Sequence, residues 1–175
     1  MSYLKNKNVL VLGGSGFLGN SVIKLLLENR FRVVTITRNE NKIKKIKPAG
    51  KIGQIEIIAA NIFEEGILDY YTKNKFAVIN LCGVLYEKEV DEFHKVHTIL
   101  PGLIAKSAKK NNVQKLIHIS SLGVSESSNS KYSRTKARGE KKISKNFSDA
   151  IILRPSLILG NGDNFFGKFK KMSLF

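Results

Sequence analysis

Short apolar runs alternate along this chain with longer stretches in which apolar residues recur every three or four positions. The first run, Val9–Leu12, predicts a buried strand because it is short, continuous and followed at once by glycines. Residues 17–29 carry apolar side chains at helical spacing, and Arg32–Thr37 is rich in the β-branched residues typical of strands. Together these segments predict a strand, a helix and a second strand that form one βαβ unit.

The same alternation continues through the rest of the chain. Pro101 and Gly102 interrupt one helical stretch, which predicts a kink or a later helix start there. Because strands that alternate with helices are typical of the α/β class, we predict a doubly wound parallel sheet of about six strands, with helices on both faces. The further predicted strands are 55–60, 76–81, 115–120 and 150–153, and the further predicted helices are 64–73, 93–104 and 131–144.

The composition is that of a globular domain, with 175 residues of which 42% are hydrophobic and 25% charged. We predict one α/β domain over residues 1–160, and we expect residues 161–175 to begin a truncated C-terminal region. No apolar run approaches the roughly 18 residues needed to cross a bilayer. Cys82 is the single cysteine, so no internal disulfide forms and a reducing, cytoplasmic compartment is expected.

The formal net charge is +16, which invites a nucleic-acid interpretation. However, 24 of the 30 basic residues are Lys and 6 are Arg, whereas base readout favours Arg. Lys, Asn and Ile are all abundant here and share A/T-rich codons, so genome composition accounts for much of the charge. We therefore expect no specific nucleic-acid partner. Peripheral contact with an anionic membrane or partner surface stays open.

Three glycines, Gly13, Gly16 and Gly19, lie between the first predicted strand and the first predicted helix. In this position glycines allow a tight turn and a close approach of the backbone to a pyrophosphate, while the helix N-terminus supplies N–H donors. The alternative is an ordinary glycine turn. The loop predicts a Rossmann-type dinucleotide site, and the residues expected to bind the cofactor are Gly13, Ser15, Gly16, Phe17, Leu18 and Gly19.

The GxxGxxG spacing resembles the short-chain dehydrogenase/reductase superfamily in its extended or atypical branch, which is similar to NAD-dependent epimerases and dehydratases. An acidic residue at the end of the second strand would select NAD, but Arg38 follows Thr37 there and suits the 2′-phosphate of NADPH. The alternative for Arg38 is an exposed arginine at a strand end. The resemblance implies that further loops flank the adenine and ribose, namely Asn61, Ile62, Leu81, Cys82 and Gly83; an Asp is usual where Asn61 stands.

Catalytic members of this superfamily use a Tyr-x-x-x-Lys pair on the helix after strand five, and Tyr132 and Lys136 match it. The spacing itself is weak evidence, because Tyr3 with Lys7 and Tyr71 with Lys75 share it. Only Tyr132 follows a strand that ends in serines and opens a helix. The resemblance therefore implies Tyr132 as the proton-exchanging group, Lys136 as its partner and ribose ligand, and Ser121 as the substrate-polarising hydroxyl. A strand-end serine without that role is the alternative for Ser121.

Two histidines lie one turn apart in the predicted helix 93–104. His97 occupies the position where catalytic relatives often carry Asn, but a half-buried structural histidine is the interpretation we favour over a proton relay. His94 and His97 lack a third ligand at usual spacing. We therefore predict no metal site.

Several segments together resemble the NADPH-binding accessory subunit family of respiratory complex I. That resemblance implies a tightly bound NADPH held as a structural group with no turnover, and complex I subunits as partners. It also implies a place in the bacterial cytoplasm, peripheral on the cytoplasmic face of the inner membrane. Two alternatives stay open: an active NAD(P)-dependent epimerase, dehydratase or oxidoreductase that uses Tyr132 and Lys136, and a decayed gene fragment. The segments are 80–87, 96–97, 118–124, 130–132, 136–140 and 162–166. Arg154-Pro155, with Gly160 and Gly162-Asp163-Asn164 beyond it, resembles the segment that leads extended members of the superfamily into their substrate region.

Overall fold

The computed structural model describes residues 7–38 and 51–160 and contains one six-stranded sheet. All neighbouring strands are parallel, and their order across the sheet is β3-β2-β1-β4-β5-β6. This is the Rossmann order, so the predicted fold class is confirmed. The strands are β1 (Asn8–Leu12), β2 (Arg32–Thr37), β3 (Ile55–Ala59), β4 (Ala77–Asn80), β5 (Lys115–Ile119) and β6 (Ile151–Leu153).

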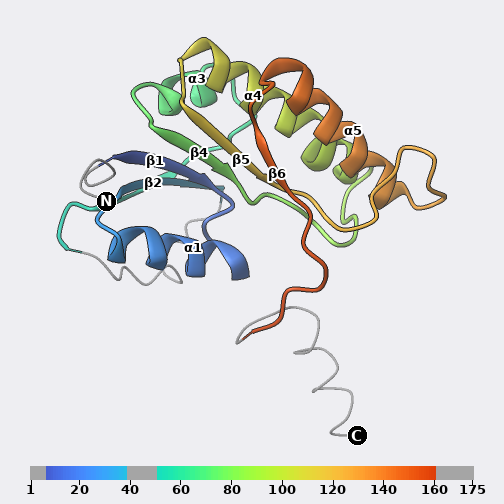
Figure 1. The fold of residues 1–175 in the computed structure, drawn as a ribbon, viewed down its shortest axis with the longest axis horizontal. Helices are drawn as coiled ribbons and strands as arrows, with labels where there is room; N and C mark the ends of the chain where they lie inside the picture. The colour runs from blue at the N-terminus through green and yellow to red at the C-terminus, as the bar shows by residue number, and fades with distance from the viewer. Residues whose placement is uncertain (1–6, 39–50, 161–175) are drawn as a thin grey trace, which may run out of the picture.

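Helices cover both faces of the sheet (Figure 1). One face packs against α1 (Phe17–Glu28), and the other packs against α3 (Ile67–Thr72), α4 (Leu100–Lys110) and α5 (Lys131–Asn146). The central strands are apolar on both sides, as expected for a parallel sheet between two helical layers. In β1, for example, Val9 and Val11 belong to the cluster with α1, whereas Leu10 and Leu12 belong to the cluster with α4 and α5.

The segment around Pro101 differs from the single helix predicted for 93–104. A π-helix, η2 (His94–Ile99), runs directly into α4, and Pro101 lies in the first turn of α4. Proline has no N–H to donate to the carbonyl oxygen of His97, four residues earlier, which accounts for a wider helical geometry just before it. The predicted kink or later start is thus a change of helix type, and the helical segment extends to Lys110.

The remaining boundaries differ from the predicted ones by a few residues. The helix expected over 64–73 is the shorter α3, because residues 61–66 form turns that end at Gly66 with φ 81°. The expected C-terminal region, residues 161–175, and its Gly-Asp-Asn segment lie outside the described residues. No helix among the described residues is long and apolar enough to span a bilayer.

The strand order reverses between β1 and β4, so the loops that follow these two strands diverge to opposite sides of the sheet. In open α/β sheets, ligands bind in the crevice at this reversal, beyond the carboxyl ends of the strands. The glycine loop after β1 and the segment after β4 both lie there, and the ends of β5 and β6 lie beside them.

Candidate functional site

The glycine loop after β1 touches the backbone of the segment after β4. Gly13 has a φ of 82°, and a Cβ there would lie 2.8 Å from the carbonyl carbon of Leu81 and 2.9 Å from the nitrogen of Cys82. The Gly13 carbonyl accepts a hydrogen bond from the Gly16 nitrogen at 3.1 Å, which closes the turn. Only glycine satisfies both the left-handed backbone and this contact. Two segments predicted to bind the cofactor, the glycine loop and the segment after β4, are therefore brought together here.

Two more glycines in the loop are needed for packing. A Cβ at Gly14 would collide with the Thr35 hydroxyl and lie 2.7 Å from Ile23, and a Cβ at Gly19 would collide with the Gly13 carbonyl. Gly19 thus lets α1 approach the loop closely. Sequence reasoning missed Gly14, although its position next to Gly13 was a signal.

Gly16 is less closely packed than Gly13, Gly14 and Gly19. It is exposed, it is the N-cap of α1, and a Cβ there would meet only the Gly13 oxygen at 3.3 Å. The N–H groups of Phe17 and Leu18 begin the helix and have no carbonyl partner within it. The helix also has no acidic residue in its first turn. An anionic group of a ligand fits here, with Ser15, Phe17 and Leu18 half-buried around it.

Arg38 is exposed immediately after β2. Because β2 and β4 are parallel strands of one sheet, Arg38 lies at the same carboxyl edge as the loop after β4. Asn61 follows β3, and its side-chain oxygen accepts a hydrogen bond from the Phe63 nitrogen at 3.2 Å. The Ile62 side chain is buried in the core cluster. Asn61 and Ile62 therefore serve the local turn and the core.

The segment after β4 is held by a buried amide–imidazole pair. The Asn80 side chain donates to His118 Nδ1 at 3.0 Å and accepts from the Cys82 nitrogen at 3.0 Å. Burial lowers the pKa of His118 to about 3, so its ring is neutral.

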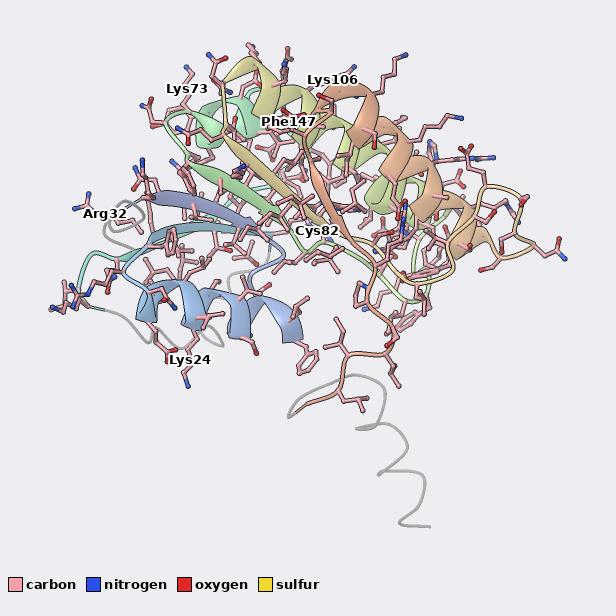
Figure 2. All side chains as sticks on the ribbon, in the orientation of Figure 1. Lys24, Arg32, Lys73, Cys82, Lys106 and Phe147 are labelled. Carbon is pink, nitrogen blue, oxygen red and sulfur yellow. The ribbon has the colours of Figure 1, made fainter. Side chains whose placement is uncertain are left out.

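Cys82, labelled in Figure 2 beside the ends of the central strands, packs its thiol against the core although the residue as a whole is half-buried. Burial raises the pKa of that thiol to about 12, which makes it unreactive.

The predicted tyrosine, lysine and serine are brought together by β5 and α5. The helix begins at Lys131, where the Ser130 hydroxyl caps it by accepting from the Ser133 nitrogen at 3.3 Å. This places Tyr132 in the first turn, and its hydroxyl lies 2.9 Å from that of Ser121. Lys136 lies one turn further on the same side of the helix.

Lys136 is buried, and its ammonium group donates to the Ile119 carbonyl at 3.0 Å. Its Nζ lies 5.9 Å from the centre of the Tyr132 ring. A Cβ added at Gly83 would lie 3.8 Å from the same Nζ, so the segment after β4 borders the lysine. Burial lowers the pKa of Lys136 to about 8, against the opposing effect of Glu140. The lysine therefore exchanges its proton near neutral pH.

His97 holds η2, α5 and the segment after β4 together. Its Nε2 accepts from the Val84 nitrogen at 3.1 Å, and its Nδ1 lies 3.3 Å from the Thr135 hydroxyl, which donates in turn to the Tyr132 carbonyl at 3.0 Å. Burial, followed by the charge of Lys136, lowers the pKa of His97 to about 4. A neutral ring with both nitrogens engaged is structural, as the sequence interpretation favoured. It is more deeply buried than the half-buried position expected.

Two charged contacts fix the borders of the site. Glu140 is buried on α5 and pairs with Arg154, which follows β6, at 2.6 Å. Burial would raise the pKa of Glu140, but the Arg154 pair outweighs it and the pKa lies below its usual range. At the start of α5, Lys131 donates to Glu87 at 2.9 Å and to Asp91 at 3.2 Å, which ties down the loop after β4. The Arg-Pro segment after β6 is thereby anchored to α5.

No group of three or more His, Cys, Asp or Glu side chains within residues 7–38 and 51–160 is arranged to hold a metal ion. His94 is exposed, whereas His97 faces inward. The two histidines therefore do not share a site.

Comparison with known proteins identifies a matching family and several similar proteins. The model of the NAD dependent epimerase/dehydratase family matches residues 9–173. The chain is 33% identical over 164 residues to NADH dehydrogenase [ubiquinone] 1 alpha subcomplex subunit 9, mitochondrial, of Dictyostelium discoideum, covering 93% of this chain and 46% of that protein. The protein of that name from Mus musculus is also 33% identical, with 91% and 42% covered. The chain thus spans less than half the length of these relatives.

Solved structures show the same fold. UDP-glucuronic acid 4-epimerase from Bacillus cereus in complex with NAD superposes with a TM-score of 0.76 at 22% identity, covering 89% of this chain and 58% of that one. The Bordetella bronchiseptica enzyme WbmH in complex with NAD⁺ gives a TM-score of 0.77 at 18% identity, covering 97% and 63%. At these identities the likeness concerns the fold.

Proposed function

Because the chain belongs to the NAD dependent epimerase/dehydratase family, we propose that it binds NADPH at the carboxyl edge of its sheet and keeps it as a structural group. In this proposal the chain is a subunit of a larger assembly related to respiratory complex I, and it turns no substrate over. A dinucleotide supplies hydride chemistry when bound; here it serves to fix the fold of the edge that holds it.

The glycine loop is the observation that carries dinucleotide binding. Gly13, Gly14 and Gly19 leave no room for a side chain, whereas Gly16 is exposed at the N-terminus of a twelve-residue helix. This arrangement leaves helix N–H groups for a pyrophosphate and space for its approach. The Lys136 ammonium, bordered by Gly83, is placed to hold a ribose hydroxyl.

Arg38 supports NADPH over NADH. The residue is exposed directly after β2, where an acidic side chain would instead accept from a ribose 2′-hydroxyl. A guanidinium there pairs with a 2′-phosphate through charge-assisted hydrogen bonds. Arg38 follows the carboxyl end of β2, which lies at the proposed cofactor edge.

Exposed apolar side chains support a protein partner over a small polar substrate. They lie on the segments that follow β4, β5 and β6, which surround the site. A polar sugar does not need such a rim, whereas a subunit interface does. The relatives named as NADH dehydrogenase subunits supply the class of partner. We place the chain in the bacterial cytoplasm, at the inner membrane. The side chains are Leu85, Tyr86, Leu122, Leu157 and Leu159, each at least half exposed.

Affinity purification of the tagged chain under mild detergent tests the assembly role. We expect complex I subunits to be recovered with the chain, in amounts that fall as salt rises, because exposed charge pairs are screened. Recovery of the chain by itself in the soluble fraction would contradict the assembly role. A chain too unstable to accumulate would favour the decayed-fragment interpretation.

A second candidate function is an NAD(P)-dependent oxidoreductase or epimerase, and the contact between Ser121 and Tyr132 favours it. With Lys136 one turn away, these hydroxyls have the arrangement for proton exchange with a carbonyl. Turnover of NADPH with any member of a carbonyl panel, lost in Tyr132→Phe, would replace the structural role with this one. Our proposal expects no turnover in either protein.

A further inference from the structure

The edge of the sheet opposite the candidate site carries a row of basic residues, which we call the basic edge. Because all strands are parallel, every strand begins at this edge, and the residues just before each strand gather there. In Figure 2, Arg32 and Lys73 lie on the side of the sheet away from Cys82. The basic edge consists of Lys7, Arg30, Arg32, Lys51, Lys73, Lys75, Lys109 and Lys115.

Backbone hydrogen bonds show that the row is continuous across five strands. The Val33 nitrogen donates to the Gln54 carbonyl at 2.8 Å, and the Arg32 nitrogen donates to the Lys7 carbonyl at 3.0 Å. The Phe76 carbonyl then accepts from the Lys115 nitrogen at 3.2 Å. Since strand neighbours lie about 4.8 Å apart, the charges project from one compact border.

The charge of this border is largely uncompensated. Arg30, Arg32, Lys51, Lys73 and Lys115 are exposed, and none of them forms an ion pair within the described part of the chain. The acidic residues nearby are Glu28, which pairs with Lys24 at 3.9 Å, Asp69, which pairs with Lys110 and also interacts with Lys73, Glu56 and Asp149.

The opposite edge has a different charge balance. Its loops carry most of the acidic residues described, several of them in ion pairs with lysines of α5. The basic edge therefore lies at the end of the sheet away from these acidic residues. These acidic residues are Glu64, Glu65, Glu87, Glu89, Asp91, Glu92 and Glu126.

An apolar side chain protrudes from the basic edge. Ile52 is fully exposed at the tip of a turn in which the Gln54 nitrogen donates to the Lys51 carbonyl at 3.1 Å. Gly53 has a φ of 80°, the left-handed conformation that such a turn requires. The Gln54 side chain accepts from the Lys51 nitrogen at 2.6 Å and donates to the carbonyls of Leu27 and Phe31. The turn is thus fixed to α1 and to the start of β2.

We propose that the basic edge docks on an anionic lipid bilayer, with Ile52 inserted into the headgroup boundary. Lysine-rich clusters with a protruding apolar residue match a surface of diffuse negative charge and an apolar interior. Nucleic-acid recognition would favour arginines and exposed aromatic rings, and Phe31 and Phe76 at this edge are half-buried. The candidate nucleotide site then faces away from the membrane. This inference does not depend on nucleotide binding.

Co-sedimentation of the whole chain with vesicles tests the proposal. The chain is expected to bind phosphatidylcholine vesicles only when they contain phosphatidylglycerol, and to be released by salt. Each basic residue at the surface contributes about fivefold in affinity. The double variant Arg32→Glu with Lys115→Glu should therefore bind at least about 25-fold more weakly. The matched control, Lys88→Glu with Arg138→Glu, changes net charge equally at exposed sites off the edge and should retain binding.

Ile52→Ser tests insertion separately from charge. It should weaken vesicle binding about tenfold, because burying an isoleucine side chain stabilises the bound state. Leu85→Ser, at an exposed position on the opposite edge, is the control and should bind as the unmodified chain does. Circular dichroism verifies that all variants are folded. The proposal is wrong if the chain stays in solution in the presence of anionic vesicles, or if both double charge variants lose vesicle binding equally. It is also wrong if the chain binds an acidic protein but does not bind anionic vesicles.

Discussion

The two halves of the candidate site are built in opposite ways. The glycine half, formed by the Gly13–Gly19 loop and Arg38, owes its shape to missing side chains that let three backbone segments touch. The tyrosine half, formed by Ser121, Tyr132 and Lys136, owes its shape to side-chain hydrogen bonds that converge from η2, β5 and α5.

This difference determines what each half tolerates. A glycine loop binds a diphosphate through backbone N–H groups, so it does not distinguish NADH from NADPH. A single added methyl group can block the access of the diphosphate to this loop. A side-chain network fixes the positions of a few polar atoms, and it tolerates loss of one hydroxyl if its neighbours remain packed. Four substitution experiments separate the halves, in order of expected effect.

The largest effects come from one close-packed glycine in each half. A Cβ at Gly19 would collide with the Gly13 carbonyl, and a Cβ at Gly139 on α5 would collide with the His97 carbonyl on η2. Both contacts are with backbone, which cannot yield as a side chain can. Gly19→Ala and Gly139→Ala should each lower the free energy of unfolding by about 3 kcal/mol, measured by urea denaturation.

Gly83→Ala is the control for these variants. A Cβ there would lie 3.8 Å from His97 Nε2 and from Lys136 Nζ, which is ordinary contact, so unfolding should change by less than about 0.5 kcal/mol. If Gly139→Ala were as stable as the unmodified chain, the close contact of η2 with α5 would not exist as described.

The next effect concerns binding through the glycine half. Gly16→Val should leave the fold largely intact, because Gly16 is exposed and the one close contact of an added Cβ, 3.3 Å to the Gly13 oxygen, is relieved by a shift of a few tenths of an ångström. The valine side chain should nevertheless occupy the path of the pyrophosphate. Affinity for NADPH and NADH should both fall at least about 100-fold, or 2.7 kcal/mol, by isothermal titration calorimetry. Leu25→Val, at an exposed site on the same helix, should bind normally. Unchanged binding in Gly16→Val would place the cofactor elsewhere.

A smaller effect separates the two cofactors. Arg38→Ala should weaken NADPH binding about tenfold, through loss of hydrogen bonds to a charged phosphate, and leave NADH binding unchanged. Arg138→Ala, an exposed arginine on α5, serves as the control in the same calorimetric titrations. Equal affinities of the unmodified chain for NADPH and NADH would remove the basis for the preference.

The smallest effect is a pH dependence that belongs to the tyrosine half. The pKa of Lys136 is about 8 because of burial, so the lysine is charged below that pH and neutral above it. If the ammonium holds the nicotinamide ribose, NADPH affinity should fall about threefold to fivefold as the pH rises through 8. Lys136→Met should bind more weakly and show no such step. A step that persists in Lys136→Met would assign it to another group.

The sheet and the glycine loop follow from local patterns. Val9–Leu12 and Arg32–Thr37 are apolar runs whose strand character does not depend on distant residues, and the predicted bounds agree with β1 and β2 to within one residue. Gly19 is required because the strand-loop-helix order brings α1 back against Gly13 and Gly14, whereas Gly13 is required because it lies against Leu81 and Cys82 after β4. The family resemblance assigned Ser121 and Tyr132 to one site, and their hydroxyls lie 2.9 Å apart.

The supporting network could not be predicted, because it joins residues far apart in sequence. Asn80 and His118 are 38 residues apart, and their contact depends on β4 and β5 being neighbours in register. Likewise, the link of His97 to Thr135 requires the close approach of η2 to α5 that Gly139 allows. The π-helix before Pro101 also depends on this packing, since proline by itself predicts only an interruption.

Native mass spectrometry of the purified, full chain is the most direct test of NADPH binding, because it weighs the protein with whatever it retains. We expect a complex of one chain with one NADPH after purification without added nucleotide. We also expect Gly16→Val to carry no nucleotide and Tyr132→Phe to keep it. A chain that is purified without nucleotide, and gains no mass when NADPH is added, would contradict NADPH binding.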